Sequence, residues 1–597
     1  MAPLATEDGN ASAGHARYND LGWKVENERG YRIPEHPFGT TRKLRVIHVG
    51  AGASGICFTK FAEDLLENVE FQLYEKNGDF GGTWLENRYP GCACDIPSAC
   101  YQFTWARNPN WSQYYSGSRE IWQYFKDVAE KHQVGRFVKF NHTVVGAQWN
   151  ADEGLWHVKV MGPNGDTFID TCNVFINGGG VLNKWKWPDI KGLHTFKGSL
   201  QHSAHYDESL DLTGKRVAVI GIGSSGVQII SNIAPIVEKL YTWVRSPTWI
   251  TAAFAQRFAG KNGNNFSYTA EQKEKFSKDP ELFLKYSKTI ESELNKRFKF
   301  ILNNTPEAKD AKNYALKEMT QKLSGNQKLM DAIIPGDFGV GCRRPTPGNG
   351  FLEALNAAHV TVFTDEMREI TQKGFIDSKG QQHEIDVIIC ATGFDTSWIP
   401  RYPVVANGFS VADMWKEEAL AYLSIAVPHI PNYFLLGGPY GPHGHGSYLP
   451  ILEATLKYIF QVIKKMQVDR IKSLAPKTDI VEAFKEHADL FLSRTAWASG
   501  CSSWFKQGRK DGPLPMFPGT RIAFFELLES PRYEHYDLQY CNSLNPFEFL
   551  GNGFSVREFD GRDLSWYLGL LGGHDIQSDL GSLTPDLLQF IPPDAWE

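Results

Sequence analysis

Two short apolar runs, each followed at once by glycines, dominate the hydrophobic pattern along this chain. The first covers residues 44–49 and leads into Gly50, and the second covers residues 217–220 and leads into Gly221. Helix-like segments follow both glycine turns. A strand, a tight glycine turn and a helix make up the first half of a nucleotide-binding βαβ unit. The pattern therefore predicts an α/β fold with two Rossmann-like dinucleotide-binding domains.

A charged segment with helical periodicity interrupts the second domain after about residue 250. Thr269 and Gln272 have the spacing of a capping box, and Thr305 stands before Pro306 as at a helix start. We predict a helical insertion here and assign it a covering role without chemistry.

Two further apolar runs end in glycines, VFINGGG at 174–180 and DVIICATGFD at 386–395. We assign both strands to the first dinucleotide-binding domain. The glycines at 178–180 either let the backbone approach a bound nucleotide or form a simple turn.

The chain divides where the pattern changes. An N-terminal arm covers residues 1–42, and the first part of the first dinucleotide domain covers 43–180. Residues 181–250 are a linker and the start of the second domain, which the insertion at 251–335 interrupts and residues 336–385 complete. Residues 386–597 return to the first domain and end in a C-terminal extension.

Composition excludes several other classes of protein. The chain has 597 residues, 42% of them hydrophobic, and a net charge of −6, so it needs more than one core and carries no nucleic-acid footprint. The N-terminus has no apolar signal segment, and no run of 18 apolar residues exists to cross a membrane. The nine cysteines are scattered and odd in number, which favours reduced thiols in the cytoplasm. We expect a cytoplasmic monomer without a metal site.

Both glycine turns carry the spacing G-x-G-x-x-G, with Gly50, Gly52 and Gly55 in the first and Gly221, Gly223 and Gly226 in the second. These glycines let the backbone approach a pyrophosphate, which rests on the helix N-terminus. A ribose-binding residue is expected about 20 positions after the last glycine.

The two ribose positions differ in charge. Glu75 occupies the first, and a carboxylate suits free ribose hydroxyls, as in FAD or NAD. Arg245 occupies the second, and a guanidinium suits the 2′-phosphate of NADP. The sequence therefore predicts one FAD-type and one NADP-type site in a single chain, which implies hydride transfer from NADPH into a flavin.

Residues 82–95 read GTWLENRYPGCACD and match the pattern G-x-W-x-x-x-x-Y-P-G-x-x-x-D at every fixed position, from Gly82 and Trp84 to Asp95. This motif resembles the one that marks Baeyer–Villiger monooxygenases within the class B flavin monooxygenases. A second family signature, F-x-G-x-x-x-H-x-x-x-W ending in Pro or Asp, is met by Phe196, Gly198, His202 and Asp207, but Tyr206 replaces the tryptophan. That replacement resembles the sister group that oxidises nitrogen and sulfur.

Two further segments extend the resemblance, which covers roughly residues 40–510. In GCRRPTPGNGF (341–351), the family position beside the flavin is Arg344, and Arg343 is the preceding basic residue that contacts NADP. In CSSWFKQG (501–508), Trp504 corresponds to the tryptophan of the mobile loop over NADP, although Lys506-Gln507-Gly508 departs from the family's glycine–alanine–asparagine continuation.

The resemblance implies the following roles. Arg344 is the catalytic residue, held by Asp95, and His202 is structural in the interdomain linker, with direct proton transfer as the alternative. The implied FAD-binding residues are Gly50, Gly52, Ala53, Ser54, Gly55, Glu75, Thr83, Trp84, Asp95 and Tyr101. The implied NADP-binding residues are Gly221, Gly223, Ser224, Ser225, Gly226, Arg245, Ser246, Arg343, Arg344 and Trp504.

The implied activity is NADPH-dependent insertion of one oxygen atom of O2 into a ketone through a C4a-peroxyflavin, giving an ester or lactone. The overall look resembles fungal members that act on cyclic, polycyclic or steroid-like ketones. Oxygenation of nitrogen or sulfur is the alternative. A disulfide or quinone reductase would place a C-x-x-C or C-x4-C pair beside the flavin strand, whereas Cys92 and Cys94 are the only close pair. A non-catalytic flavoprotein that only binds its cofactors is the last alternative.

Overall fold

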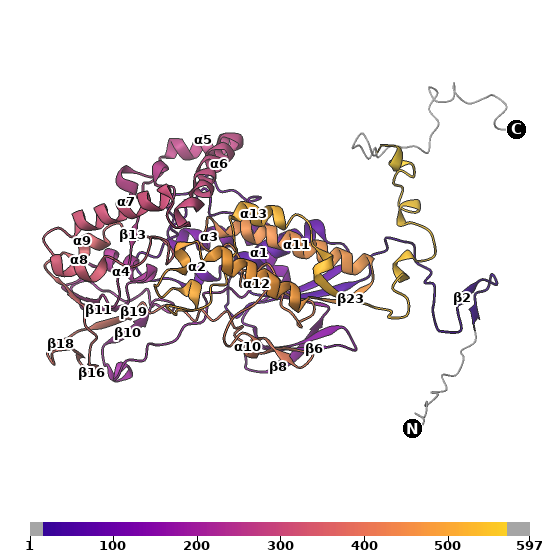
Figure 1. Cartoon of the computed structure of the whole chain (residues 1–597), viewed down its shortest axis with the longest axis horizontal. Coiled ribbons are helices and arrows are strands. Elements are labelled where there is room, and N and C mark those ends of the chain that lie inside the picture. The colour runs from indigo at the N-terminus through magenta and orange to yellow at the C-terminus, as the bar shows by residue number, and fades with distance from the viewer. Residues whose placement is uncertain (1–15, 570–597) are drawn as a thin grey trace, which may run out of the picture. The chain divides into compact units, whose positions relative to one another are not determined.

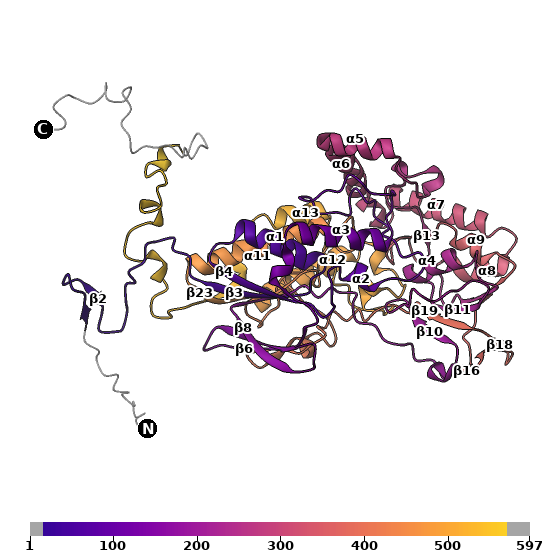
Figure 2. The same cartoon turned by 180° about the vertical axis from the view of Figure 1, so that it is seen from behind.

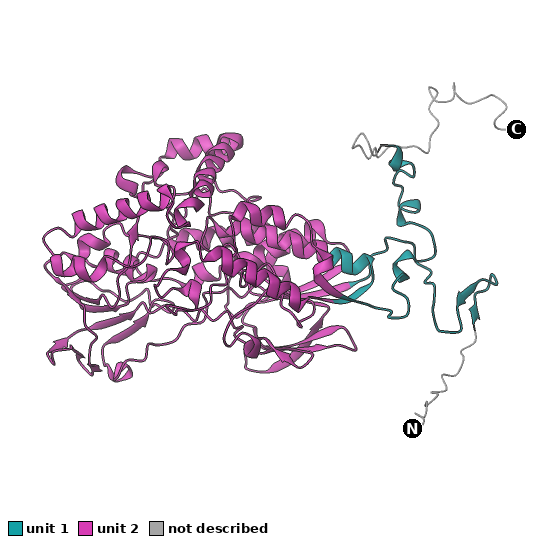
Figure 3. Ribbon diagram, viewed as in Figure 1, with its two compact units in different colours: residues 1–43, 463–473, 538–597 teal, residues 44–462, 474–537 magenta. Residues whose placement is uncertain are grey.

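The computed structural model describes residues 16–569, which form two compact units (Figure 3). Unit 2 contains residues 44–462 and 474–537 and holds both predicted dinucleotide domains. Unit 1 contains the chain ends together with residues 463–473. The first part of the N-terminal arm, 1–15, and the end of the C-terminal extension, 570–597, lie outside the described residues.

The first sheet of unit 2 is wholly parallel, in the order β22-β9-β3-β4-β5. Its central strand β3 (Leu44–Val49) is almost completely buried because helices cover both faces of such a sheet. It feeds α1 (Ala53–Leu65) through the first glycine turn. The other strands are β4 (Val69–Tyr74), β5 (Val138–Lys139), β9 (Val174–Asn177) and β22 (Tyr433–Leu435).

The second sheet is also parallel, in the order β10-β19-β11-β12-β15. Its strand β11 (Arg216–Ile220) feeds α4 (Ser224–Ile233) through the second glycine turn. The remaining strands are β10 (Ser199–His202), β12 (Lys239–Trp243), β15 (Val360–Phe363) and β19 (Val387–Cys390).

The assignment of the strand at 386–395 to the first domain was wrong. Strand β19 lies between β10 and β11, in the second sheet. All four of its residues are buried, as expected for a central strand of either parallel sheet, so the hydrophobic pattern does not distinguish the two sheets. Its pairing with Val217–Ile220 places it in the second sheet. The return to the first domain therefore comes after β19.

Unit 2 contains two further sheets of three or more strands, one mixed because β20 pairs with β6 in parallel, and one antiparallel. One has the order β21-β20-β6-β7-β8, with β6 (Thr143–Asn150), β7 (Leu155–Met161), β8 (Thr167–Cys172), β20 (Val404–Ala406) and β21 (Phe409–Ser410). The other is a meander of β16 (Glu369–Thr371), β17 (Gly374–Ile376) and β18 (Gln382–Glu384).

The insertion is helical. It contains α5 (Ala270–Lys278), α6 (Pro280–Lys296), α7 (Pro306–Lys322) and α8 (Gln327–Ile333), and α5, α6 and α7 gather on one side of unit 2, away from β10, β11 and β19 (Figures 1 and 2). The predicted capping box is confirmed, since Thr269 and Gln272 exchange side-chain and backbone hydrogen bonds. The start of α7 at Thr305 is confirmed as well.

Three helices follow the second sheet in the chain: α11 (Tyr448–Val468), α12 (Thr478–Leu492) and the shorter α13 (Arg521–Leu527). Earlier in the chain, α3 (Ser118–Lys131) follows the 82–95 motif. No helix within residues 16–569 is both long and apolar enough to cross a membrane.

Unit 1 is built mainly from the two chain ends. Strands β1 (Arg17–Tyr18) and β2 (Lys24–Glu26) form a short hairpin. Pro37 and Phe38 bridge to Gly551 and Ser555, and Arg42 donates to the carbonyl of Met466. The predicted N-terminal arm is therefore held by backbone contacts to the C-terminal extension.

Candidate active site

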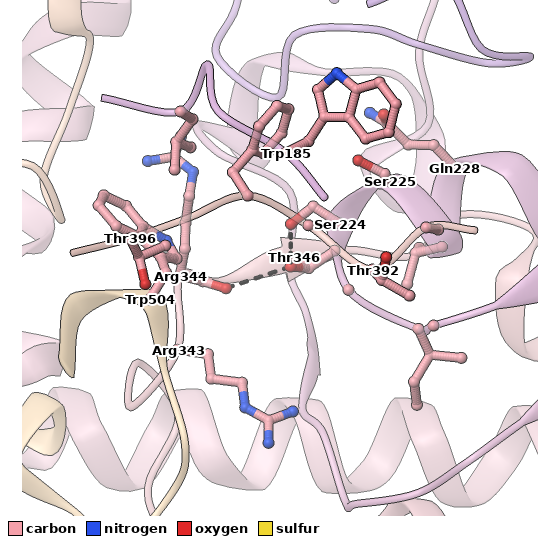
Figure 4. Close-up of a pocket in the computed structure, with 18 of the residues that line it drawn as sticks. Trp185, Ser224, Ser225, Gln228, Arg343, Arg344, Thr346, Thr392, Thr396 and Trp504 are labelled. Atoms are coloured by element: carbon pink, nitrogen blue, oxygen red, sulfur yellow. Dashed lines mark hydrogen bonds between the residues drawn. The ribbon is translucent and has the colours of Figure 1, made fainter. Parts of the chain in front are cut away.

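A cleft of about 2580 Å³ runs through unit 2 and is lined by four of the segments singled out in the sequence. Residues 83–95, 221–228, 343–349 and 502–509 contribute to its walls, together with the linker around Trp185. Figure 4 shows Arg343 and Arg344 leaving one segment in different directions, with Trp504 beside Arg344.

The second glycine turn forms a tight cradle at the N-terminus of α4. A Cβ added at Gly226 would lie 1.9 Å from the carbonyl oxygen of Gly221, so only glycine fits where strand and helix meet. Ser224 and Ser225 open the helix and line the cleft, and the Ser224 hydroxyl lies 3.1 Å from that of Thr346 (Figure 4). The backbone amides of this turn are available to an anion.

Arg245, Ser246 and Arg343 meet at the end of β12. Arg343 donates through Nε to the carbonyl of Ser502 at 2.9 Å and through a terminal nitrogen to Ser246 Oγ at 3.2 Å. Burial lowers the pKa of Arg343, and the nearby charge of Arg245 lowers it further. Within the described chain, neither arginine forms an ion pair with a carboxylate, so the site is a positive pocket suited to a phosphate.

Arg344 and Asp95 form a two-pronged ion pair across the cleft. Arg344 Nε lies 3.1 Å from one Asp95 oxygen, and a terminal nitrogen lies 2.7 Å from the other. The Arg344 guanidinium also stands 5.2 Å from the ring centre of Phe254. Burial acts to lower the pKa of Arg344, but the charge and hydrogen bonds of Asp95 outweigh it and raise that pKa. Arg344 is therefore a fixed, permanent cation in the cleft wall.

The middle of the 82–95 motif joins the two domains. Tyr89 donates to Gln228 Oε1 at 2.8 Å, and Gln228 in turn donates to the carbonyl of Ala93 at 2.9 Å. Gly91 has φ of +77°, and a Cβ there would lie 2.0 Å from Asn232 Nδ2 on α4. The Tyr-Pro-Gly sequence thus docks the first domain onto the helix of the second glycine turn.

The first glycine turn and Glu75 border a smaller cavity of about 290 Å³. Glu75 accepts hydrogen bonds from the backbone N–H of Ala51 at 2.7 Å and of Asn77 at 2.8 Å. Burial raises the pKa of its carboxyl group, and these backbone donors oppose the rise. Glu75 is therefore fixed beside Gly50, where a ribose of a nucleotide on this turn would lie.

The remaining predicted residues of the first domain lie at two places. Gly52, Ala53, Ser54 and Gly55 form the turn and first residues of α1, and Ser54 Oγ donates to the carbonyl of Gly178 at 2.9 Å. The backbone at 178–180 thus approaches the glycine turn closely. Thr83, Trp84 and Tyr101 line the large cleft instead, where Trp84 Nε1 donates to the Tyr101 hydroxyl at 3.1 Å.

His202 lies at the end of β10, fully buried. Its Nδ1 accepts from the N–H of Ala204 at 3.1 Å, its Nε2 lies 3.3 Å from Thr392 Oγ1, and its ring stacks on Trp185 at 4.4 Å. Burial lowers its pKa to about 4. These contacts hold the linker to the second sheet.

The segment at 499–510 forms a compact loop whose first helical turn carries Trp504 (Trp504–Lys506). Lys506 is buried, and its Nζ donates to the carbonyl of Lys510 at 2.8 Å and to that of Ser499. Phe505 packs into a cluster with Trp497, and Trp504 faces the cleft. The departure from the family pattern at 506–508 thus supplies a lysine that closes the loop internally.

One expectation about the cysteines was wrong. Cys342 and Cys501 form a disulfide across a sequence separation of 159 residues, whereas reduced thiols were expected throughout. Counting and spacing along the chain could not bring together two cysteines so far apart. The close pair Cys92 and Cys94 is free and buried, and burial raises the pKa of both thiols.

Sequence reasoning also missed several residues that shape the site: Gln228, Phe254, Thr346, Cys342, Cys501 and Lys506. Thr346 lies within the arginine motif at 341–351 and could have been inferred from it. The others act through contacts between segments that are remote in the sequence.

A family model described as flavin-binding monooxygenase-like matches residues 43–497. The chain belongs to the flavin-binding monooxygenase-like family. Among the curated relatives of this protein, the FAD-binding monooxygenase tazF of Aspergillus terreus is 38% identical to it, and the aligned region covers 89% of this chain and 96% of the relative. The FAD-binding monooxygenase stcW of Emericella nidulans is 34% identical and covers 89% of each chain.

Solved structures agree with the fold of this flavin-binding monooxygenase-like protein. A cyclohexanone monooxygenase from Rhodococcus sp. Phi1 bound to NADP+ is similar with a TM-score of 0.72 and 23% identity, covering 84% of this chain and 100% of that one. OTEMO in complex with FAD and NADP is similar with a TM-score of 0.72 and 23% identity, covering 83% of this chain and 99% of that one.

These findings confirm the resemblance to flavin monooxygenases, and the predicted α/β class with two parallel nucleotide-binding sheets is confirmed. The predicted cofactors, FAD and NADP, agree with the family description, with the relatives' names and with the ligands of the OTEMO structure.

Proposed function

We propose that this protein is an FAD-dependent, NADPH-consuming Baeyer–Villiger monooxygenase that inserts one oxygen atom of O2 into a ketone to give an ester or lactone. The observation that carries the proposal is the ion pair between Arg344 and Asp95, in the wall of a cleft lined both by residues assigned to NADPH and by Thr83, Trp84 and Tyr101, which are assigned to FAD. The 82–95 motif supports the same reaction.

The residues around the first glycine turn fit FAD. The turn opens α1, and Glu75 stands beside it with both carboxylate oxygens fixed by backbone donors. Thr83, Trp84 and Tyr101 lie in the large cleft and would hold the ring system at the place where the two domains meet. FAD, when bound there, supplies the redox chemistry by taking a hydride from NADPH and passing electrons to O2.

The residues around the second turn fit NADPH. Gly221, Gly223 and Gly226, with Ser224 and Ser225, offer backbone amides to the pyrophosphate. Arg245, Ser246 and Arg343 would bind the 2′-phosphate, which their shared positive charge favours over a free hydroxyl. Trp504 would cover the nucleotide from the side of its loop.

Arg344 would perform the electrostatic part of catalysis. A ketone carbonyl oxygen gains negative charge when its carbon is attacked, and a desolvated guanidinium at fixed position stabilises that charge without reorganising. Asp95 would act as a positioning residue, because it binds two donor nitrogens of Arg344 and leaves the remaining donors free. His202 would keep the structural role that its contacts support.

We propose a bulky cyclic, polycyclic or steroid-type ketone as the substrate, the class that the family resemblance implies. Pro442, His443 and Gly446 line the cleft from the segment that precedes α11, and Tyr448 lines it from the start of that helix. Burial lowers the pKa of His443 to about 4. A neutral imidazole and apolar neighbours suit an uncharged substrate. The cytoplasmic location and the monomeric state stay predictions, and the disulfide removes part of the argument for the first.

The direct test is turnover. Purified protein with FAD, NADPH and air should convert a bulky cyclic ketone into a product one oxygen atom heavier with a lactone carbonyl, detected by mass spectrometry and infrared absorption. NADPH oxidation that releases only hydrogen peroxide with every ketone tried would contradict ketone oxygenation.

A second activity, oxygenation of amines or sulfides, is favoured by one observation. Tyr206 stands where the Baeyer–Villiger signature has tryptophan, and its buried hydroxyl has no hydrogen-bond partner among residues 16–569. A tertiary amine and a thioether should therefore be offered under the same conditions. An N-oxide or sulfoxide without any lactone would support this second activity over the first.

A further inference from the structure

The disulfide between Cys342 and Cys501 joins two of the segments that line the cleft. Cys342 directly precedes Arg343 and Arg344, and Cys501 lies three residues before Trp504. Both sulfur-bearing residues are buried, with 0% and 3% of their surface exposed. The bond therefore lies beneath the cleft wall and fixes two segments whose functional side chains point into the cleft.

A second link runs beside the disulfide. Arg343 Nε donates to the carbonyl of Ser502 at 2.9 Å, so the loop supplies the acceptor that orients this guanidinium toward Ser246. If the loop moved away, Arg343 would lose its hydrogen-bond acceptor and, in the same movement, Trp504 would leave the cleft. The positions of the loop and of the arginine are thus coupled.

The loop is also held by contacts of its own, besides the disulfide. Lys506 donates to two carbonyls of the loop, Ser503 accepts the N–H of Phe505 at 3.2 Å, and Phe505 is buried among apolar side chains. The cross-link therefore attaches to the arginine segment a loop that its own contacts also hold. A cross-link between distant segments keeps them at high effective concentration for each other.

We propose that the Cys342–Cys501 disulfide is a positioning element that holds the Trp504 loop against Arg343 and thereby sets the affinity for NADPH. Arg344 and Asp95 keep their own ion pair, so the step at the ketone does not depend on this bond. The inference rests on the NADPH site proposed above.

Reduction of the bond has a simple balance. A dithiol gives two electrons and two protons to the disulfide, which becomes two thiols, and the dithiol becomes a cyclic disulfide. Because both sulfurs are buried, this exchange requires the loop to open first. Dithiothreitol is the probe, and iodoacetamide then blocks the thiols that form.

The experiment has three forms of the whole protein: oxidised wild type, reduced and blocked wild type, and the double variant Cys342→Ala/Cys501→Ala. Cys541→Ala is the matched control, because Cys541 is a free, exposed cysteine. Alkylation of the denatured, unreduced wild type should label seven of the nine cysteines. Nine labels would overturn the proposal at once.

The readouts separate this inference from the proposed function. Without any substrate, trypsin should cut after Arg509 or Lys510 about 10-fold faster in the reduced and double-variant forms, because the loop opens more often. With substrates, KM for NADPH should rise about 10-fold while kcat changes less than about 3-fold, as expected for a lost charge-assisted hydrogen bond in binding.

Equal cutting rates in all forms would overturn the inference even if NADPH is the cofactor. Faster cutting in a protein that never oxidises NADPH would instead show that the loop is held as proposed and that the assigned reaction is wrong. A collapse of kcat with unchanged KM would also overturn the inference, since the bond would then act on Arg344.

Discussion

Arg245 offers a sharp test of the assigned nucleotide sites, because within the described chain no carboxylate pairs with it. It lies beside Arg343, whose pKa its charge lowers, so the two cations repel each other until an anion binds. Arg245→Ala should therefore leave the stability of the ligand-free protein unchanged or slightly higher. The variant removes the proposed partner of the 2′-phosphate and the repulsion of Arg343, but no hydrogen bond or ion pair within the described chain.

The expected size of the binding effect follows from the chemistry of one contact. A hydrogen bond to a charged group contributes about 1.5–3 kcal/mol. At about 1.4 kcal/mol for each tenfold change, Kd for NADP+ should rise about 10- to 100-fold. Kd for NAD+ should change by less than about 2-fold, because NAD+ lacks the 2′-phosphate and therefore has no hydrogen bond with Arg245 to lose.

Isothermal titration of the FAD-loaded protein with NADP+ and with NAD+ measures both constants. Arg368→Ala is the matched control, since Arg368 lines the same cleft but is not among the groups that act on Arg343. Equal losses for both nucleotides would refute the assignment of Arg245 to the 2′-phosphate. Equal effects of both variants would mean that the cleft acts only through its overall charge.

Three further predictions follow from other contacts. Arg344→Ala should still allow NADPH to reduce the flavin, but product formation should fall at least about 100-fold, because one transition-state donor is lost; single-turnover absorbance and product analysis separate the two steps, and retained product yield would contradict the role. Gly91→Ala should lower the free energy of unfolding by at least about 2 kcal/mol because of its positive φ and the contact with Asn232, whereas Gly214→Ala, with positive φ but open space, should cost about 1 kcal/mol; equal shifts in Tm would show that the contact does not matter. Burial lowers the pKa of His48 to about 3. Because the unfolded chain binds this proton near pH 6.5 and the folded protein only near pH 3, His48 does not lower the free energy of unfolding above about pH 6.5, and lowers it progressively as the pH falls toward 3. His48→Phe should therefore narrow the difference in Tm between about pH 7.5 and 5, and an unchanged difference would assign that pH dependence to other groups.

The sequence predicted those parts of the molecule that local chemistry determines. The two glycine turns, the charges of Glu75 and Arg245, and the arginine motif each lie in a short segment whose spacing has one mechanical meaning. The structure brings Arg344 and Asp95 together across 249 positions, as the two motifs implied, and their roles in catalysis stay a prediction.

What the sequence could not supply are pairings between remote segments. Strand β19 is buried on all sides, so its residues fit either parallel sheet equally well, and only its neighbours in space decide. The disulfide joins cysteines from two different motifs, and neither motif contains the other's partner. Phe254 comes from the insertion, whose helical pattern gives no hint that a residue at its edge packs on Arg344.

The docking of Tyr89 and Gly91 on α4 limits how this scaffold can be recombined. A hybrid that keeps residues 82–95 but takes its second nucleotide domain from a relative keeps this contact only if the relative also has glutamine at 228 and asparagine at 232, the residues that contact this segment. Where the relative differs there, exchange points chosen from the glycine turns alone would yield proteins whose two domains do not pack on each other. Transferring residues 82–95 together with α4 from the same parent protein would preserve this packing contact.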